Sequence, residues 1–357
     1  MRENLLLITL RFLSGNPNSK ICTERNGRID NPKWIAVVAL AVAFVAGGAV
    51  AQAQQKQKVS RLGFLTTNSA AAEQPRLVSF LEALRALGHF EGKNLTIEYR
   101  FTDGKFDRLP ELAAELVKLN VDVLIANTTN AALAAQKATR TIPIFFMGVT
   151  DPVGAGLIDS LARPGGNITG MTNIASVLSS KRLELLKETV AKLSRVAVLW
   201  DPKNPGSTPQ WNESQLAARI LGLQVHSMAV SVADQYESAF KDAVKARSGA
   251  VAVTLNPLAN SNQKLLLDLA EKYRLPAIYA RSDIVEKGGL MSYATSPAQD
   301  GRDAARLVDK LLRGTKSEDI PTEQPMTFEF VVNLKAAKQI GLTIPPTVLL
   351  RAQKVVR

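Results

Sequence analysis

The feature that most constrains this chain is a regular alternation of apolar, strand-like runs with helical segments, and the alternation occurs twice. The first series extends from Val59 to Val149 and the second from Lys181 to Ala280. Strands that alternate with helices form parallel sheets, because a crossover must return the chain to the same end of the sheet. The two series therefore predict an α/β protein with two Rossmann-like lobes, each built on a parallel sheet.

Length and composition agree with two globular lobes of ordinary size. The chain has 357 residues, of which 46% are hydrophobic and 21% are charged.

The net charge of the chain is +12, but basic residues stand beside acidic ones along the predicted helices, as in ELVKLN and KRLELLKETV. We interpret this charge as a solvated surface. No helix-turn-helix pattern or basic tail accompanies it, so a nucleic-acid partner is not predicted.

The first 53 residues have the pattern of a secretory signal peptide. Three basic residues between positions 25 and 33 precede an apolar run over residues 34–50, which ends in small residues. We expect cleavage after Ala51 or Ala53 and a periplasmic protein; an uncleaved segment that anchors the protein in the membrane is the alternative. The one cysteine, Cys22, precedes the apolar run, so the processed protein would contain no disulfide and no Cys-based metal site.

Polar residues recur where the predicted strands end. They are Asn68 and Ser69; Thr128, Thr129 and Asn130; Asp151; Asn256; and Asp283. Open parallel sheets bind ligands at the carboxyl ends of their strands. Backbone N–H groups at a helix start, with hydroxyl groups beside them, also favour an anion. The sequence therefore predicts a ligand site along these strand ends.

Within that site, the segment from Thr128 to Asn130 is the best candidate to hold a carboxylate. Asp151 and Asp283 are the candidates for a ligand ammonium group, and Tyr279 is a candidate wall of an apolar pocket. Residues of these types at helix starts also act simply as N-caps, and a lone tyrosine is often a core residue. Both interpretations stay open from the sequence. Asp151-Pro152 additionally predicts a short helix that extends to about Ala162.

The sequence offers little for catalysis. It contains two histidines, His89 and His226, and neither accompanies a cluster of acidic residues. It lacks a G-x-S-x-G turn, a phosphate-binding Walker loop and a dinucleotide-binding glycine pattern. We therefore expect no enzymatic activity, no bound metal and no cofactor.

Seven motifs follow one another along the chain: LEALRALGHFEGKNLTIEYR, DRLPELAAELVKLNVDVLIA, DPVGAGLIDSLARPGGNITG, KRLELLKE, RLPAIYA, GGLMSYA and VNLKAAKQIGLTIPPTVLLRA. In this order they resemble the motifs of one family, the ABC-transporter solute-binding proteins of the tryptophan/tyrosine type. The resemblance extends from about Arg61 to Leu350. One loop departs from the family, since residues 127–130 replace a Gly-Thr-Pro-like segment.

The resemblance implies a type I periplasmic-binding fold with a ligand cleft between two lobes and three crossovers of the chain. We place the crossovers near residues 172–174, 281–283 and 325–327. The N-terminal lobe would then comprise residues 59–173 and 282–325, and the C-terminal lobe residues 174–281 and 326–357. The same resemblance implies ligand contacts at Asn68–Ser69, Thr128–Asn130, Asp151, Asn256 and Tyr279–Asp283.

The function implied is that of an extracytoplasmic receptor of an ABC importer. It would be a monomer that captures a small solute bearing a carboxylate, such as an aromatic amino acid, by closing its lobes and would present it to an inner-membrane permease. The alternatives are the ligand-sensing domain of a signalling system and an enzyme on the same scaffold.

Overall fold

The structure is a computed structural model, and it describes residues 59–357. The predicted signal segment, its cleavage sites and Cys22 lie outside the described residues. Within residues 59–357, no helix is long and apolar enough to cross a membrane.

The first lobe is built on a five-stranded sheet whose strands are all parallel, in the order β2-β1-β3-β4-β5. Its central strands are almost continuously apolar and fully buried, as in VLIAN and the first four residues of IFFMGV. Such runs are typical of strands covered on both faces by helices. The strands are β1 (Ser60–Thr66), β2 (Leu95–Phe101), β3 (Val123–Asn127), β4 (Ile144–Val149) and β5 (Ile168–Thr172).

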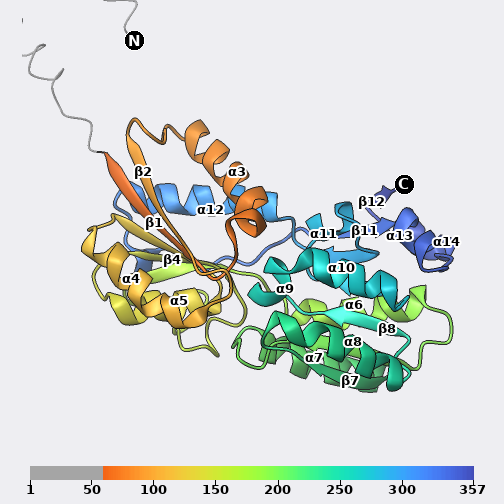
Figure 1. The fold of residues 1–357 in the computed structure, drawn as a ribbon. Coiled ribbons are helices and arrows are strands. Elements are labelled where there is room, and N and C mark those ends of the chain that lie inside the picture. Colours follow the sequence, from red (N-terminus) through yellow and green to blue (C-terminus); the bar gives the residue numbers. More distant parts are fainter. Residues whose placement is uncertain (1–58) are drawn as a thin grey trace, which may run out of the picture. The chain divides into compact units, whose positions relative to one another are not determined.

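Helices cover both faces of this sheet. Figure 1 shows α12, from late in the chain, lying beside α3. Residues of α3 and α12 share one buried apolar cluster with strand residues such as Phe64 and Phe145, while α4 and α5 pack on the opposite face. The helical segments of this lobe are α3 (Ala70–Ala86), η1 (Phe106–Arg108), α4 (Leu109–Lys118), α5 (Thr129–Ala138), α12 (Pro297–Leu312) and η3 (Ser317–Asp319).

The second lobe is built on a seven-stranded sheet in the order β12-β11-β10-β9-β8-β6-β7. All neighbouring strands are parallel except β10 and β11, which pair antiparallel. The strands are β6 (Arg195–Trp200), β7 (Gln224–Ala229), β8 (Ala250–Val253), β9 (Ala277–Tyr279), β10 (Met291–Ala294), β11 (Glu329–Asn333) and β12 (Lys354–Val356). Two mostly parallel sheets confirm the predicted fold class.

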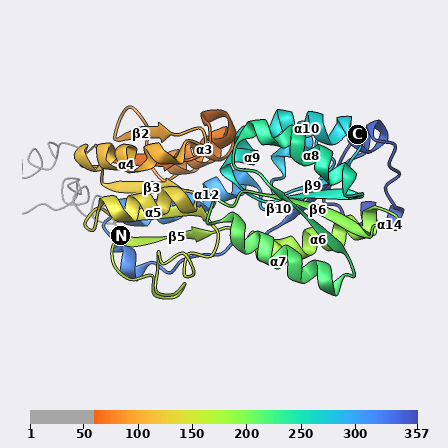
Figure 2. The same ribbon diagram turned by 60° about the horizontal axis from the view of Figure 1, so that its bottom comes forward.

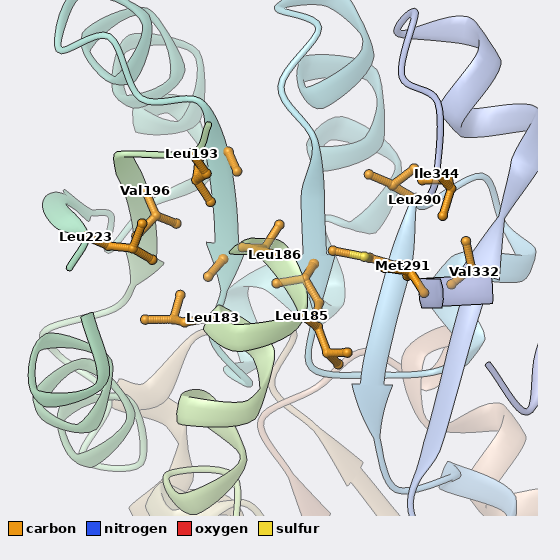
Figure 3. Close-up of a cluster of buried hydrophobic side chains, with 14 of the residues drawn as sticks. Leu183, Leu185, Leu186, Leu193, Val196, Leu223, Leu290, Met291, Val332 and Ile344 are labelled. Carbon is orange, nitrogen blue, oxygen red and sulfur yellow. The ribbon is translucent and has the colours of Figure 1, made fainter. Parts of the chain in front are cut away.

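Helix α6 forms much of the core of the second lobe. Figure 3 shows three of its leucines, Leu183, Leu185 and Leu186, within a buried cluster that also contains Val196 and Met291 of the sheet. The helical segments of this lobe are α6 (Val177–Thr189), α7 (Ser207–Ile220), η2 (Ala233–Gln235), α8 (Tyr236–Lys245), α9 (Pro257–Ser261), α10 (Gln263–Lys272), α11 (Asp283–Glu286), α13 (Leu334–Gln339) and α14 (Pro346–Leu349).

The chain passes between the two sheets three times. The passages lie between β5 and α6, between β10 and α12, and between η3 and β11. The second passage differs from the expected one at residues 281–283, and the boundary of the lobes moves with it. Residues 283–294 include α11 and β10, and β10 pairs with β9 and β11 of the second sheet. Figure 2 shows β10 beside β9. The chain therefore enters the first lobe only after Ala294, not at position 282.

The predicted helix from Asp151 to Ala162 is wrong, because the structure has a series of turns there. Asp151 has a φ of +49°, and its Oδ1 accepts a hydrogen bond of 2.9 Å from the backbone N–H of Gly154. Gly156 follows with a φ of +71°. Two glycines in the first six residues disfavour a helix, and the positive φ values direct the chain into turns instead.

Candidate functional site

The carboxyl ends of the strands from both sheets meet at two adjoining cavities between the lobes. One, here called the polar cavity, is lined mainly by hydroxyl, amide and guanidinium groups. Its lining residues are Asn68, Arg76, Asn127, Thr128, Thr129, Gly148, Thr150, Asn173, Asn204, Gly206, Leu255, Asn256, Pro257, Asn260 and Arg281. Both lobes contribute to it, as expected for a ligand crevice at the strand ends of parallel sheets.

The other cavity, here called the hinge-side cavity, adjoins the polar cavity and lies beside the first two chain passages. It is more apolar, and it shares Arg76, Gly148, Asn173, Leu255 and Arg281 with the polar cavity. Its remaining lining residues are Met147, Met171, Thr172, Ala175, Leu178, Arg182, Ala280, Thr295, Pro297 and Asp300.

The two lobes touch each other directly across the polar cavity. The side-chain amide of Asn260 donates to Asn68 Oδ1 at 3.3 Å, and Arg281 Nη2 donates to the carbonyl oxygen of Ala72 at 3.0 Å. A Cβ atom on Gly206 would lie 3.0 Å from Thr129 Oγ1, so a side chain there would press against the opposite lobe. The space inside each cavity is small, about 30 Å³. The two lobes are therefore in direct contact around the polar cavity.

The start of α5 gives the polar cavity hydrogen-bond donors. Thr128 has a φ of +94°, a conformation rare for a β-branched residue. It caps the helix, since its Oγ1 accepts from the N–H of Ala131 at 3.4 Å, and it also shares a 2.9 Å hydrogen bond with Thr67 Oγ1. Thr129 Oγ1 does not cap the helix and faces Gly206 across the cavity. The site thus combines helix N–H groups with a hydroxyl, which suits an anion.

A buried carboxylate, Glu73 on α3, holds several of these groups in position. Its Oε1 accepts hydrogen bonds from Thr66 Oγ1 at 2.9 Å and from the side-chain amides of Asn68 and Asn127. Its Oε2 forms a 2.8 Å ion pair with Arg76. Burial alone would raise the pKa of Glu73, but Arg76 and the amide donors outweigh it, so the pKa lies below its usual range. Glu73 is therefore an ionised anchor for the cavity wall.

Two further ion pairs stand at the cavities. Arg76 Nη2 lies 3.4 Å from Asp300 Oδ2, and that oxygen also accepts from Thr295 Oγ1 at 3.1 Å. Burial raises the pKa of Asp300 despite this pairing. Arg281 Nε donates a hydrogen bond of 2.8 Å to Asp283 Oδ1. Burial alone would raise the pKa of Asp283, but this hydrogen bond and the positive charges of Arg281 and Lys287 keep the pKa below its usual range.

Arg182 of α6 lines the hinge-side cavity and differs from the other two arginines. It is 3% exposed, and its guanidinium donates to the backbone carbonyl oxygens of Tyr293 at 2.9 Å and Ala175 at 3.2 Å. Among residues 59–357, no carboxylate pairs with it. Burial lowers the pKa of Arg182 to about 9, so it is still a cation at neutral pH.

The structure brings four of the predicted site residues together at the polar cavity and leaves five elsewhere. Asn68, Thr128, Thr129 and Asn256 line the cavity. Asn256 also caps α9, since its Oδ1 accepts from Ala259 N–H at 2.8 Å. The residues that do not line either cavity are Ser69, Asn130, Asp151, Tyr279 and Asp283.

Each of these five has a different local role. Ser69 Oγ caps α3, and its N–H donates to Ser261 of the other lobe at 3.3 Å. Asp151 is exposed and caps a turn, while Asp283 is paired with Arg281. Tyr279 is 2% exposed within the core of the second lobe. Asn130 follows Thr129 in the first turn of α5, away from the cavity lining. The two carboxylates expected to hold an ammonium group are therefore not at the cavities.

Sequence reasoning missed Glu73, Arg76, Arg182 and Asp300, and it offered Arg281 only within a range. The charge pattern predicts a solvated face for the helix that contains Arg182, whereas the structure buries this residue. The sequence did contain one indication of the Glu73–Arg76 ion pair. The two residues are three positions apart on a helix that follows a polar strand end, and side chains at this spacing lie on the same face of a helix. Within residues 59–357, no group of three or more His, Cys, Asp or Glu side chains could hold a metal ion.

Comparison with known families identifies the chain. The model of the family "ABC transporter substrate binding protein" matches residues 70–356. The chain belongs to this family. A tyrosine-binding protein of Clostridioides difficile (strain R20291) is 27% identical over 266 residues, which are 74% of this chain and 75% of that protein. These relatives are solute-binding proteins, in agreement with the expectation that the chain is not an enzyme.

Solved structures show the same fold. A conserved domain protein from Vibrio cholerae (O1 biovar El Tor, strain N16961) has a TM-score of 0.79 at 28% identity, covering 84% of this chain and all of that one. An ABC domain from Streptococcus pneumoniae in complex with L-tryptophan has a TM-score of 0.77 at 25% identity, with 83% and 99% covered. The ligand-free, open structure of the substrate-binding protein CD0873 from Clostridium difficile has a TM-score of 0.61 at 25% identity, with 84% and 99% covered.

Proposed function

We propose that this protein is the extracytoplasmic receptor of an ABC importer and that it captures an amino acid with an apolar, aromatic side chain in the cleft between its lobes. The observation that carries the proposal is the pair of adjoining cavities built from both lobes, one lined mainly by polar side chains and one to which apolar side chains such as Met147, Met171 and Leu178 also contribute. Relatives named for tyrosine binding and for a complex with L-tryptophan support the same ligand class.

The two cavities suit the two ends of such a ligand. The polar cavity offers the ligand carboxylate the free N–H groups at the start of α5, the hydroxyl of Thr129, and the nearby cations Arg76 and Arg281. The hinge-side cavity offers the ligand side chain an apolar surface that includes Met147, Met171 and Leu178. Methionine side chains adapt to flat aromatic groups and attract them through sulfur.

Capture proceeds by closure of the lobes. Direct contacts across the cleft support a closed form, and the space left in each cavity is smaller than an amino acid, so the lobes must separate to admit a ligand and close around it less tightly than in this structure. The higher TM-score against the tryptophan complex than against the ligand-free, open structure, at equal identity, supports the same conclusion. The ligand then shifts an open–closed equilibrium by binding the closed form more tightly.

The predicted signal peptide and the family support a periplasmic location, a permease in the inner membrane as partner, and a monomeric receptor. Small-angle scattering on the processed protein should show compaction when saturating ligand is added. N-terminal sequencing of the exported protein should find cleavage after Ala51 or Ala53.

Calorimetry on the processed protein with tryptophan, tyrosine and phenylalanine tests the binding site. Thr129→Val keeps the side-chain shape and removes a hydroxyl that caps nothing, so affinity should fall about ten- to hundred-fold, the equivalent of a hydrogen bond to a charged group. Its melting temperature should change little. Thr128→Ala provides a comparison of stability only, because it removes the helix cap at Ala131 N–H and should cost about 1 kcal/mol in the free energy of unfolding.

Two outcomes would refute the proposal. If the wild-type protein bound no member of the aromatic amino acid panel, the ligand class would be wrong. If Thr129→Val bound its ligand as tightly as the wild type, the carboxylate would not lie at the start of α5.

A further inference from the structure

Arg182 is the one buried arginine of the two cavities for which residues 59–357 supply no carboxylate. Arg76 has both Glu73 and Asp300, and Arg281 has Asp283. The Arg182 guanidinium carries five donors in a planar fork, and the two contacts to backbone carbonyl oxygens satisfy only part of them. Its position in the cavity wall leaves the cavity as the place from which a further acceptor can come.

Burial makes this arrangement costly for the protein alone. Arg182 is 3% exposed, and a charge removed from water is unfavourable unless opposite charge or hydrogen bonds compensate it. Backbone carbonyl oxygens compensate only partly, since they carry no net charge. A buried cation that faces a ligand cavity without a counter-charge favours a ligand that brings one or brings a strong acceptor.

The position of Arg182 determines which end of the ligand it meets. Arg182 lines the hinge-side cavity together with Met171 and Leu178, and it does not line the polar cavity. In the proposed binding mode, the ligand carboxylate occupies the polar cavity and the apolar group extends into the hinge-side cavity. Arg182 therefore meets the part of the ligand that lies away from the carboxylate.

We propose that Arg182 is a specificity-determining residue that selects ligands carrying an acceptor oxygen, a phenol hydroxyl or a carboxylate, at the distal end of their apolar group. This inference rests on the proposed function and deepens it, because it divides the aromatic amino acids into preferred and disfavoured ligands. Tyrosine has such an oxygen, and phenylalanine is the same molecule without it. A site built around a buried donor rejects the analogue that leaves this donor unpaired.

A purely structural role for Arg182 predicts a different result. Its two acceptors, Tyr293 and Ala175, lie on or beside the first two passages between the lobes, so Arg182 could simply fasten the hinge. Loss of a hinge contact would lower the stability of the protein and would reduce the affinity for every ligand by the same factor. It would not alter the ratio of affinities for two ligands that differ by one hydroxyl.

The test is calorimetry on the processed protein with tyrosine, phenylalanine and 4-carboxyphenylalanine. The wild type should bind tyrosine about ten- to hundred-fold more tightly than phenylalanine, as expected for one hydrogen bond to a charged donor. Arg182→Met, which keeps length and removes the donors, should bring this ratio close to one. Arg182→Lys should retain part of the preference. Lys181→Met on the same helix, whose partner Glu184 lies outside both cavities, is the control and should leave the ratio unchanged.

The affinity for 4-carboxyphenylalanine shows whether Arg182 prefers a carboxylate or a phenol hydroxyl as its acceptor. A carboxylate acceptor would make it the tightest of the three ligands in the wild type, and a phenol acceptor would leave tyrosine tightest. Equal binding of tyrosine and phenylalanine by the wild type, or an unchanged ratio in Arg182→Met, would overturn the inference and leave the proposed function standing. Failure of all three ligands to bind would overturn both.

Discussion

Glu73 gives the most direct test of how the cleft is held together. It is fully buried, accepts three side-chain hydrogen bonds and pairs with Arg76 at 2.8 Å. Glu73→Gln keeps the shape and one acceptor oxygen but removes the charge. Removal of one partner from a buried ion pair costs about 3–5 kcal/mol, because the other charge is left uncompensated.

The lower end of that range applies here, because Arg76 keeps its second partner, Asp300, at 3.4 Å. We therefore expect a loss of about 3 kcal/mol in the free energy of unfolding, and a melting temperature lower by about 6 °C. Glu82→Gln is the matched control, since Glu82 is exposed on the same helix and its replacement should change stability by less than about 0.5 kcal/mol.

The pH dependence gives a second and independent measurement. The pKa of Glu73 is lowered in the folded protein, so its contribution to stability is fully present above the unfolded pKa and is lost as the pH falls through the folded pKa. The difference in unfolding free energy between wild type and Glu73→Gln should therefore shrink below about pH 4. Urea unfolding of both proteins at a series of pH values measures this difference in unfolding free energy. A cost below about 1 kcal/mol, or a difference that does not change with pH, would contradict the argument.

Three other substitutions test neighbouring parts of the cleft. Asp300→Asn should cost less stability at pH 7 than Glu73→Gln, as urea unfolding would show, because burial raises the pKa of Asp300 and its ionised form is the less favoured one in the folded protein. Tyr279→Phe should leave ligand affinity measured by calorimetry unchanged, since Tyr279 lies in the core of the second lobe and lines neither cavity. Gly206→Val should weaken ligand binding and raise the radius of gyration in the presence of ligand, because a Cβ there already lies 3.0 Å from Thr129 Oγ1; an unchanged affinity would show that the lobes close differently.

The fold was predictable because its determinants are local. Buried parallel strands such as VLIAN and RVAVLW are continuous apolar runs, and glycines such as Gly88 and Gly222, both with positive φ, follow the ends of helices. The passage after β10 was misplaced because strand pairing is not local. Nothing in MSYA alone tells which sheet it joins, and only its pairing with β9 and β11 decides.

The candidate site was predictable only in part. Hydroxyl and amide residues at strand ends have a positional signal, and this signal led to Asn68, Thr128, Thr129 and Asn256. Charged residues on helices have no such positional signal, because the same sequence pattern of acidic and basic residues occurs on solvated helix faces and in buried ion pairs. Arg182 in KRLELLKETV is buried because α6 meets the chain passages there, which is a property of the tertiary structure.

The energetics of the cleft bear on why a ligand would control its closure. The direct polar contacts between the lobes, such as those of Asn260 with Asn68 and Arg281 with Ala72, replace hydrogen bonds to water and contribute about 0.5–1.5 kcal/mol each. A shift from 1% to 99% closed requires about 5.5 kcal/mol of differential binding. One charged hydrogen bond at the start of α5 and one at Arg182 would supply about 3–6 kcal/mol, and burial of the apolar group adds to it. The residues proposed to recognise the ligand are thus sufficient, in magnitude, to drive closure.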